Sequence, residues 1–516
     1  MDRSFNLVDQ PFVPCSLLDG QLTEMGLRDI LVRAHEVAEI RDDSPLVTIA
    51  LHRLLLALLH RNFGPASLDA WSKLWQAGRF DPQVLESYLE QWRDRFDLCD
   101  PKHPFYQWPV MEESKPVPVT RLALVAANNA TLFDHRYEAQ ELPLPPNQTA
   151  QLLIAYQAFA VGGGVSKPFN LCHSPLISQG GYLILIVGEN LFQTLCLNLL
   201  VSTSSTPIPS SASDTPIWER STLPAPDEKR TVPLGYLDYL TWQSRRVRLL
   251  PHEGDQLRFD RMHMLQGMRL TDSFGSSEPM AVYVRNQKDE YRARGFDESR
   301  GLWRDSHVLL SGADYQKAPL GVQQVEQLKR RGLLDRKTTF RLAAFGLSTD
   351  QAKVHFWRHE TMPLPLAYLG DKALLDDLRD ALEATEDAGK AVYESIRNLA
   401  EIVSTGSQGR PDQDRAKQLA AALYQQGRFW ARLEEPFRRL LQELPTGDDD
   451  ARLKTLEQWR AKVCGIARET FNDLLDGLDL SPRILKGIYS DQWGAQKTLN
   501  VALHKILQIG KEPANA

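Results

Sequence analysis

The sequence predicts an α+β protein, with a large mixed N-terminal domain over residues 1–370 and an all-α four-helix bundle over residues 371–516. Short apolar runs bounded by glycines, such as Tyr182–Val187, are typical of buried strands and lie among helical segments. These strands and helices do not alternate regularly, which favours an α+β domain over a doubly wound sheet. After about Gly370 the strand signals stop, and four long segments with apolar residues at helical spacing follow.

Length and composition indicate a protein of several domains in the reducing cytoplasm. A chain of 516 residues is too long for one compact core, so we expect two or three domains. The five cysteines form no Cys-x-x-Cys pair, which argues against a zinc ribbon and a disulfide scaffold. Residues 1–10 lack the basic start and apolar core of a signal peptide. The most apolar stretch, Leu46–Leu59, is broken by His52 and Arg53 and is shorter than the roughly 20 residues that span a bilayer. We therefore expect a buried amphipathic helix there and no membrane contact.

The net charge of −6 limits the ways in which this chain can bind nucleic acid. A free-standing nucleic-acid-binding domain usually has a basic balance. Any contact with DNA must therefore come from a local patch, or from a larger assembly that supplies positive charge.

The first part of the N-terminal domain contains signals for one strand and two helices. Phe5–Pro14 alternates and ends in proline, as expected of a short strand that leads into a loop. Ser44 followed by Pro45 predicts the start of a helix that runs to about Leu59. Pro82–Phe96 predicts a second helix, and Cys99–Pro118, rich in proline and aromatic residues, predicts an ordered surface loop.

The rest of this domain contains further strand signals. Ser202–Pro216 is rich in Ser, Thr and Pro and predicts a flexible connection. Val282–Arg285 and Thr338–Phe345 predict strands. A polar turn between Thr338–Phe345 and Val354–Trp357 predicts a hairpin with Gln351 and Ala352 at its tip.

Each of the four segments after Gly370 carries an apolar face. The apolar residues are Val392, Ile396, Leu399 and Val403 in the first segment, Leu419, Leu423, Trp430, Leu433 and Phe437 in the second, Leu456, Trp459, Val463 and Ile466 in the third, and Ile488, Leu499, Leu503 and Ile506 in the fourth. Polar turns separate the segments, which predicts a four-helix bundle with short loops and a kink or break at Pro436.

Motifs of common catalytic sites are missing from the sequence. It contains no GxxxxGK[ST] phosphate loop, no HExxH, no GxSxG and no set of protein-kinase motifs. His103, Asp134, His135 and His173 could be combined into a metal site, but they lie in separate segments, and isolated histidines are usually structural or solvent-facing. We therefore expect no catalytic residue, no metal and no cofactor.

Three features have both a binding interpretation and a structural one. The glycine run Gly162–Gly163–Gly164 follows the helix-like stretch Leu152–Val161 and allows close backbone approach to a ligand, or forms a plain helix cap and turn. The hairpin tip at Gln351–Ala352 inserts into a partner or is a solvated turn. Basic residues beside Trp242 form a phosphate-binding patch or cover a solvent-facing strand edge; they are Arg245, Arg246 and Arg248.

Several stretches, taken in order, resemble the large-subunit (CasA) family of the type I-E CRISPR Cascade complex. Phe5–Pro14 is similar to the family's opening NLxDxWIPV pattern, and His103–Gln107 to its HPFxQ segment. The other matches are the Gly162–Gly164 run, Tyr239–Gln243 with its arginines, Gly301–Asp305, Gln351–Ala352 followed by Trp357–Glu360, and the closing helical bundle. Seven matches in order over nearly the whole chain make coincidence an unsatisfactory explanation.

The resemblance implies a non-catalytic subunit of bacterial antiviral defence. Members of the family lie near the 5′ handle of the CRISPR RNA, beside the handle-binding, backbone and small subunits. They read the protospacer-adjacent motif (PAM) of double-stranded target DNA through the minor groove, whose code is degenerate. They also assist R-loop formation and help recruit the helicase–nuclease.

The resemblance also assigns roles to individual residues. The glycine run would contact the PAM, and Gln351 with Ala352 would form a wedge that unstacks the first target pair at a cost of a few kcal/mol. Leu132, Phe133 and Asp134 match a loop that reaches the RNA handle and the neighbouring subunit. Some relatives carry asparagine where this chain has Asp134, and a carboxylate cannot donate a hydrogen bond to a phosphate.

The family's PAM-reading lysine has no clear counterpart in this chain. Some relatives carry a cysteine cluster before that lysine, whereas Leu249–Leu270 contains no cysteine. Arg269 and Arg261 are the nearest basic candidates, and Arg269 is our assignment for this basic finger.

Two alternatives stay open at the level of sequence. One is a helical scaffold or adaptor without nucleic-acid contact, for which reversal of the charges of Arg245 and Arg246 would leave DNA binding unchanged. The other is an enzyme with a hidden metal site around His103 and His173, for which metal analysis is the test.

Overall fold

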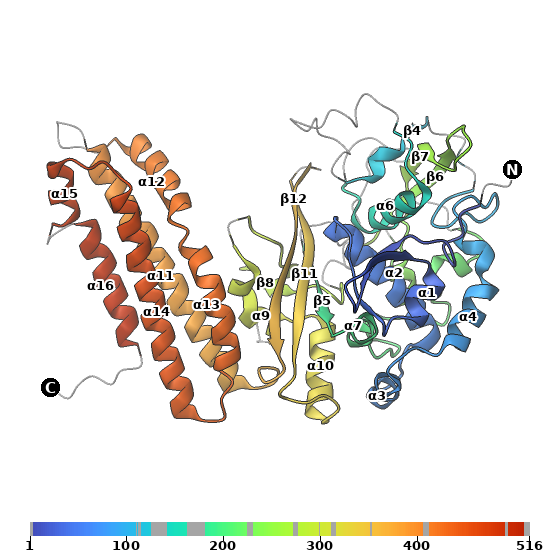
Figure 1. The fold of residues 1–516 in the computed structure, drawn as a ribbon, viewed down its shortest axis with the longest axis horizontal. Helices are drawn as coiled ribbons and strands as arrows, with labels where there is room; N and C mark the ends of the chain where they lie inside the picture. The colour runs from blue at the N-terminus through green and yellow to red at the C-terminus, as the bar shows by residue number, and fades with distance from the viewer. Residues whose placement is uncertain are drawn as a thin grey trace. The chain divides into compact units, whose positions relative to one another are not determined.

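The computed structural model describes residues 4–109, 111, 115–124, 142–162, 181–223, 231–271, 277–298, 300–310, 316–350, 353–405, 412–490 and 494–509. The chain divides into two compact units. Unit 1 contains Met1–Leu302 and Val308–Leu366, and unit 2 contains Trp303–His307 and Ala367–Ala516. Unit 1 is mixed and unit 2 is helical (Figure 1), which confirms the predicted α+β class with a C-terminal helical region.

Unit 1 is built around one buried helix, α2 (Pro45–Phe63). Ser44 precedes it in an extended conformation and Pro45 occupies its first turn, as the sequence predicts. By length and composition α2 could cross a membrane, but 78% of its most apolar window is buried inside the protein. A helix that is apolar on every side is expected in a core, and α2 contacts α6 (Pro146–Phe159), α7 (Leu191–Asn198) and α8 (Tyr236–Leu240).

The strands described in unit 1 form four three-stranded antiparallel sheets. Their orders are β2-β1-β3, β12-β11-β5, β4-β7-β6 and β10-β8-β9. The bounds are β1 (Val13–Leu17), β2 (Leu22–Met25), β3 (Val37–Ile40), β4 (Val117–Pro118), β5 (Tyr182–Val187), β6 (Arg245–Pro251), β7 (Phe259–Gln266), β8 (Tyr283–Arg285), β9 (Tyr291–Ala293), β10 (Gln316–Lys317), β11 (Thr339–Asp350) and β12 (Lys353–Pro365). The remaining helices are α1 (Leu27–Val32), α3 (Leu68–Ala77), α4 (Pro82–Gln91), α9 (Ser306–Leu310) and α10 (Leu320–Arg330), with short 3-10 turns between them.

Most of the predicted elements of unit 1 are confirmed. The fully buried β5 fills the predicted strand, and α4 with the 3-10 turn Arg93–Phe96 fills the predicted second helix. The predicted strand over Phe5–Pro14 is wrong, because the strand begins only at Val13 and Asn6 makes an isolated bridge to Asp97. Ser202–Pro216 contains neither helix nor strand.

Unit 2 contains four helical passes, with two departures from the prediction. The helices are α11 (Lys372–Ser404), α12 (Gln413–Gly427), α13 (Phe429–Glu443), α14 (Asp449–Asp476), α15 (Pro482–Ile488) and α16 (Ala495–Gln508). The second pass breaks at Arg428, whose φ is +50°, while Pro436 lies inside α13. Pro436 therefore does not break the helix, and the alternative of a kink there stays a prediction. The fourth pass is two helices, α15 and α16, rather than one.

A short segment from the middle of the chain completes unit 2. The Trp303 ring lies 4.7 Å from the Phe437 ring and 6.2 Å from the Trp430 ring. Arg304 lies 3.4 Å over Trp430 and forms a bidentate pair with Glu386. We predicted a single boundary at residue 370, whereas the contact division falls after Leu366 and assigns Trp303–His307 to unit 2.

Packing between α11 and α13 depends on a residue without a side chain. A Cβ atom at Gly389 would overlap the Trp430 indole. We predict that Gly389→Ala lowers the stability of the full chain by about 1–3 kcal/mol, because overpacking outweighs the helix propensity gained. Thermal unfolding measures the change.

The control is Gly465→Ala, inside α14, where an added Cβ meets nothing within 4 Å. That variant should gain up to about 1 kcal/mol from helix propensity. Equal effects of the two substitutions would contradict the packing argument.

Candidate nucleic-acid interface

The end of α6, just before the glycine run, is fixed to residues 243–245 by a buried glutamine. Gln157 Nε2 donates to the Arg245 carbonyl oxygen (2.8 Å) and to Gln243 Oε1 (3.0 Å). Gln157 Oε1 accepts from the Arg245 backbone N–H (3.0 Å), and the Gln157 carbonyl accepts from Ser244 Oγ (2.7 Å). Because buried amides need partners for both oxygen and nitrogen, this arrangement determines where the chain leaves α6.

Arg245 holds the residue that precedes the glycine run. Its side chain is buried, donating from one terminal nitrogen to the Ser244 carbonyl (2.9 Å) and from the other to the Val161 carbonyl (3.0 Å). A guanidinium in this position anchors the Val161 carbonyl. The assignment of Arg245 to the phosphate patch stays a prediction.

Arg246 and Arg248 lie on the opposite face of β6, because strand side chains alternate. Arg246 Nε donates to the Gln266 carbonyl (3.0 Å), and its guanidinium lies 5.3 Å from the centre of the Trp108 ring. Arg248 donates to the Asp100 carbonyl (3.3 Å), and partial burial lowers its pKa. Both are half-buried, so β6 is an edge strand but not a solvent-facing row of arginines. Their contact with phosphates stays a prediction.

The segment that carries Arg269 meets the same three residues, 243–245. The Gly267 N–H donates to the Ser244 carbonyl (3.1 Å), and the Met268 N–H donates to the Gln243 carbonyl (2.9 Å). A Cβ atom at Gly267 would overlap the Gln243 carbonyl oxygen, so this approach requires glycine. Arg269 follows two residues later and is half-buried. The start of the glycine run and the Arg269 segment are thus neighbours.

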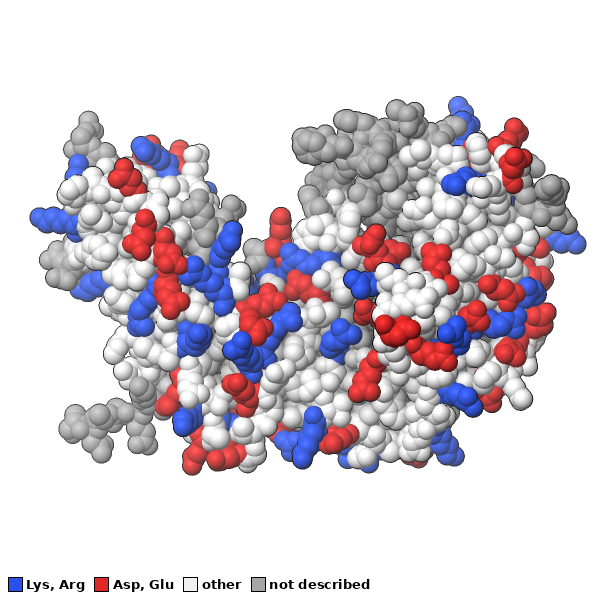
Figure 2. Space-filling view, in the orientation of Figure 1, with Lys and Arg blue, Asp and Glu red and all other residues white. Residues whose placement is uncertain are grey.

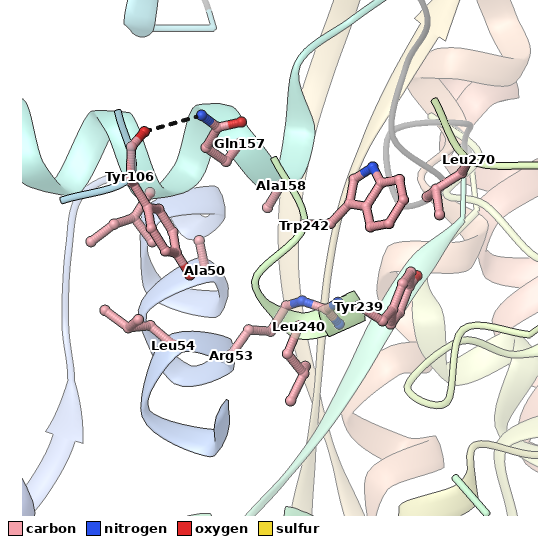
Figure 3. Close-up of a pocket in the computed structure, with 11 residues that line it drawn as sticks. Ala50, Arg53, Leu54, Tyr106, Gln157, Ala158, Tyr239, Leu240, Trp242 and Leu270 are labelled. Atoms are coloured by element: carbon pink, nitrogen blue, oxygen red, sulfur yellow. Dashed lines mark hydrogen bonds between the residues drawn. The ribbon is translucent and has the colours of Figure 1, made fainter. Parts of the chain in front are cut away.

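One cavity lies between these segments (Figure 3). Its volume is about 30 Å³, and its lining includes Gln157 and Ala158 from α6, Leu270 next to Arg269, and Trp242. The side chains of Ala50, Arg53 and Leu54 from α2 line it too. The glycine run and the Arg269 segment therefore share a support that reaches back to the core helix.

A buried ion pair positions the Tyr239–Gln243 stretch. Arg53 lies 3.1 Å from Glu278, and both side chains are almost fully buried. Burial opposes the charge of Arg53, but the Glu278 carboxylate outweighs it and the pKa of Arg53 is raised. Tyr239 Oη donates to Glu278 (2.5 Å), and burial together with this carboxylate raises the pKa of Tyr239 far above its ordinary value. The pair fixes the position of α8 against α2.

The two strands that flank the predicted wedge form a long hairpin (Figure 1). β11 and β12 pair from Thr339↔Pro365 to Asp350↔Lys353, with a register shift at Ser348/Thr349. At the far side of β12, Arg358 donates to the backbone carbonyls of residues 297, 298 and 300, and Glu360 accepts from the Leu302 N–H (2.6 Å). The Trp357–Glu360 and Gly301–Asp305 motifs are therefore joined by the hydrogen bond between Glu360 and Leu302.

Several predicted site residues lie outside the described residues. These are Gly163 and Gly164, Gln351 and Ala352, and the loop residues Leu132, Phe133 and Asp134. Of the four residues considered for a metal site, only His103 is described, and the described residues contain no cluster of three or more His, Cys, Asp or Glu side chains that could hold a metal.

Sequence reasoning did not assign roles to three residues that hold this site together. Gln157, Gly267 and Gln107 each fix one loop to another, and Gln107 does so by donating to the Leu98 carbonyl (2.9 Å) and accepting from the Leu249 N–H (2.9 Å). A glutamine on the apolar face of a helix, as at Gln157, is the only signal in the sequence that could have indicated such a role.

Comparison with known proteins gives matches over nearly the whole chain. The family model for CRISPR-associated protein Cse1 matches residues 6–470. The CRISPR-associated protein CasA/Cse1 of Thermus thermophilus is 32% identical over 506 residues, which cover 94% of this chain and 95% of that protein.

Solved structures show the same fold. The crystal structure of Thermus thermophilus CasA matches with a TM-score of 0.80 and 28% identity, over 98% of this chain and 100% of that one. Cse1 from Acidimicrobium ferrooxidans matches with a TM-score of 0.81 and 24% identity, over 99% of this chain and 100% of that one. A chain of a CRISPR RNA-guided surveillance complex matches with a TM-score of 0.76 and 20% identity, over 98% and 99% of the two chains.

We predict that Arg245→Met loosens the start of the glycine run. The variant removes the donor to the Val161 carbonyl, while the Ser244 carbonyl still accepts from the Gly267 N–H, so the loss should cost about 1–3 kcal/mol. Hydrogen exchange of peptides over residues 155–162 should become faster. Arg246→Met, on the other face of β6, is the control and should leave exchange there unchanged. A slower rate of DNA binding without faster exchange would indicate that Arg245 contacts phosphate after all.

Proposed function

Because this chain belongs to the CRISPR-associated Cse1 (CasA) family, the large subunits of Cascade, we propose that it reads the PAM of double-stranded DNA without being an enzyme. It contacts the minor groove, helps open the duplex for pairing with the guide RNA, and helps recruit the helicase–nuclease. Its partners are the handle-binding, backbone and small subunits, the CRISPR RNA and the target duplex, in the cytoplasm.

The observation that carries this proposal is the convergence on residues 243–245. Arg245 holds Val161 at the start of the glycine run, and Gly267 brings the Arg269 segment against Ser244 and Gln243. The residue before the glycine run and the two residues before Arg269 are therefore all bonded to residues 243–245, which supports a common position for the two features that the resemblance assigns to the PAM. A site that reads a groove needs such fixed supports, since base edges are distinguished by position.

Glycines suit minor-groove reading for a steric reason. The groove is about 6 Å wide, and a backbone without Cβ atoms can present its N–H groups to the acceptors on the groove floor. Because A·T and T·A present the same acceptors there, a subunit of this kind tolerates several PAMs.

The long β11–β12 hairpin suits the wedge role assigned to Gln351. Twelve residues of β11 pair with β12, and β5 pairs with β11 on its other side. A stiff two-stranded support can press its tip into a base step, which a free loop cannot do without paying conformational entropy. The cost of unstacking is offset by PAM contacts and by guide–target pairing.

Charge is consistent with a subunit that binds DNA only within an assembly. On the face in Figure 2, acidic and basic side chains are interspersed over the surface. The net charge of −6 gives no general attraction to phosphates. Guide RNA pairing and the partner subunits must then supply most of the affinity, and this chain supplies discrimination.

The test of PAM reading uses guide-loaded complex assembled with and without this chain. Duplexes that carry a matched target next to a library of trinucleotides are titrated at fixed salt. Tight binding should need both this chain and particular trinucleotides. Binding that is indifferent to the chain would favour a scaffold without nucleic-acid contact.

We predict that Gly163→Asp weakens binding of PAM-containing duplexes by at least about tenfold, through steric block and charge repulsion. Duplexes without a PAM should be affected little. Gly447→Asp is the control, since it adds the same charge in unit 2 at a position where a Cβ meets nothing within 4 Å. Normal PAM-dependent binding by Gly163→Asp would indicate that the glycine run forms only a turn and does not contact the PAM.

We predict that Gln351→Ala leaves assembly intact and slows R-loop formation, because the wedge no longer fills the opened base step. Stopped-flow measurement with a fluorescent base at the first target pair gives the rate. Gln287→Ala, an exposed glutamine in the turn between β8 and β9, is the control. Equal rates for the wild type and both variants would contradict the wedge.

A further inference from the structure

A second recess in unit 1, which we call the aromatic–cationic cleft, contains groups that the PAM site does not use. Its volume is about 270 Å³. The lining residues on which the argument rests are Arg95, Lys102, Trp108, Trp218, Arg220 and Gln243. Among the described residues that line it there is no Asp or Glu, in a chain whose net charge is −6.

Four buried donors in this lining have no hydrogen-bond acceptor in the structure. They are Arg95 Nε, Arg220 Nε, Trp108 Nε1 and Gln243 Nε2. A buried donor without a partner is unfavourable, and native proteins contain few of them. Because all four are donors and belong to residues that line one recess, a group that satisfies them must be rich in acceptors.

The orientation of the Gln243 amide is fixed by its neighbour. Gln157 donates to the Arg245 carbonyl and accepts from the Arg245 N–H, so its own amide has one orientation. Gln157 Nε2 then donates to Gln243 Oε1, which leaves Gln243 Nε2 as the unpaired donor. Gln243 is only 2% exposed, so bulk water does not supply the missing acceptor.

The two arginines are held in place by their other nitrogens. Arg220 pairs with Asp238 (2.8 Å) and donates to the Thr215 carbonyl (3.1 Å). Arg95 donates to the Arg220 carbonyl (3.2 Å), while its Nε lies 3.4 Å from the exposed Asp94 carboxylate, outside hydrogen-bond geometry. Both guanidinium groups are thus positioned in advance and keep one donor unused.

We propose that the aromatic–cationic cleft binds one unpaired nucleotide. A phosphate suits the charge of the exposed Lys102 and the unused Nε donors of Arg95 and Arg220, and the carbonyl and ring-nitrogen acceptors of a base suit Trp108 Nε1 and Gln243 Nε2. The half-exposed ring of Trp108 provides a surface for base stacking, whereas Trp218 is only 5% exposed and packs on Phe96. A simple anion would satisfy the cations but leave the two neutral donors unpaired, so the lining favours a ligand that combines a charge with a planar acceptor edge.

The nucleotide comes from an RNA or from a separated DNA strand. Only this choice of source rests on the proposed function. The cleft shares one residue, Gln243, with the supports of the glycine run, but its other lining residues are different. The two sites therefore fail or succeed in separate measurements.

The experiment titrates the full chain with fluorescent oligonucleotides of one sequence, as RNA and as single-stranded DNA, and follows anisotropy. Trp108→Phe, which keeps an aromatic ring but removes the donor, should weaken binding by about tenfold. Lys102→Glu should weaken it by a similar factor and reduce its salt dependence. Matched controls outside the cleft are Trp75→Phe and Lys73→Glu on α3, which should bind as the wild type does.

Photocrosslinking identifies the contact and its source. Oligonucleotides with 5-iodouracil, as RNA and as DNA, are irradiated with the free chain and with the assembled complex, and crosslinked peptides are mapped by mass spectrometry. Crosslinks to Trp108 or Trp218 that are lost in Lys102→Glu support the proposal, and the strand that gives them is the source. Crosslinks elsewhere only, or unchanged affinity in both cleft variants, overturn it.

The same variants are assayed for PAM-dependent duplex binding and for thermal unfolding. Retained PAM dependence with lost crosslinks shows that the cleft is a separate nucleotide site. If the wild type binds duplexes without PAM dependence but still gives the cleft crosslinks, the proposed function is overturned and the nucleotide site in the cleft stands. Mononucleotides should displace the bound oligonucleotide, and an acidic peptide should not. Displacement by the peptide but not by mononucleotides would overturn the proposed nucleotide site.

Discussion

The buried amide of Gln157 is the constraint on which the proposed interface depends. It satisfies its oxygen and nitrogen on Arg245 and Gln243, and this places the end of α6 against residues 243–245. Once that contact exists, Arg245 reaches Val161, and Gly267 closes on the other side. Removal of one partner would leave several buried polar groups unpaired, so these contacts form or fail as a unit.

The long helices and buried strands could be predicted from local sequence patterns. The features that depend on contacts between distant residues could not. The capping pair Ser44–Pro45 and the apolar run of β5 need only local information, and both were found. Trp303 joins unit 2 through Phe437, which lies far along the chain, and no local pattern encodes that. Proline was a poor guide in α13, because the bundle holds Pro436 inside the helix and the left-handed residue Arg428 makes the break.

Arginine counts overestimate how much of this chain can meet nucleic acid. Arg245 followed by Arg246 in the sequence suggests one basic patch, but strand alternation sends the two side chains to opposite faces. Arg53 forms an ion pair with the Glu278 carboxylate, and Arg358 donates hydrogen bonds to backbone carbonyls. The useful measure is the number of buried donors left without an acceptor, and four such donors belong to residues that line the aromatic–cationic cleft.

Two of the motifs through which this chain resembles the CasA family, His103–Gln107 and Trp357–Glu360, act as joints between segments. Gln107 of the His103–Gln107 segment fixes residue 98 to residue 249, and Glu360 fixes β12 to Leu302. Residues of this kind determine where each loop begins and ends, whereas the residues between the joints are free to change. Under the proposed function, a change in the preferred PAM would arise from substitutions within a loop, because the buried hydrogen bonds that position the loop lie outside it.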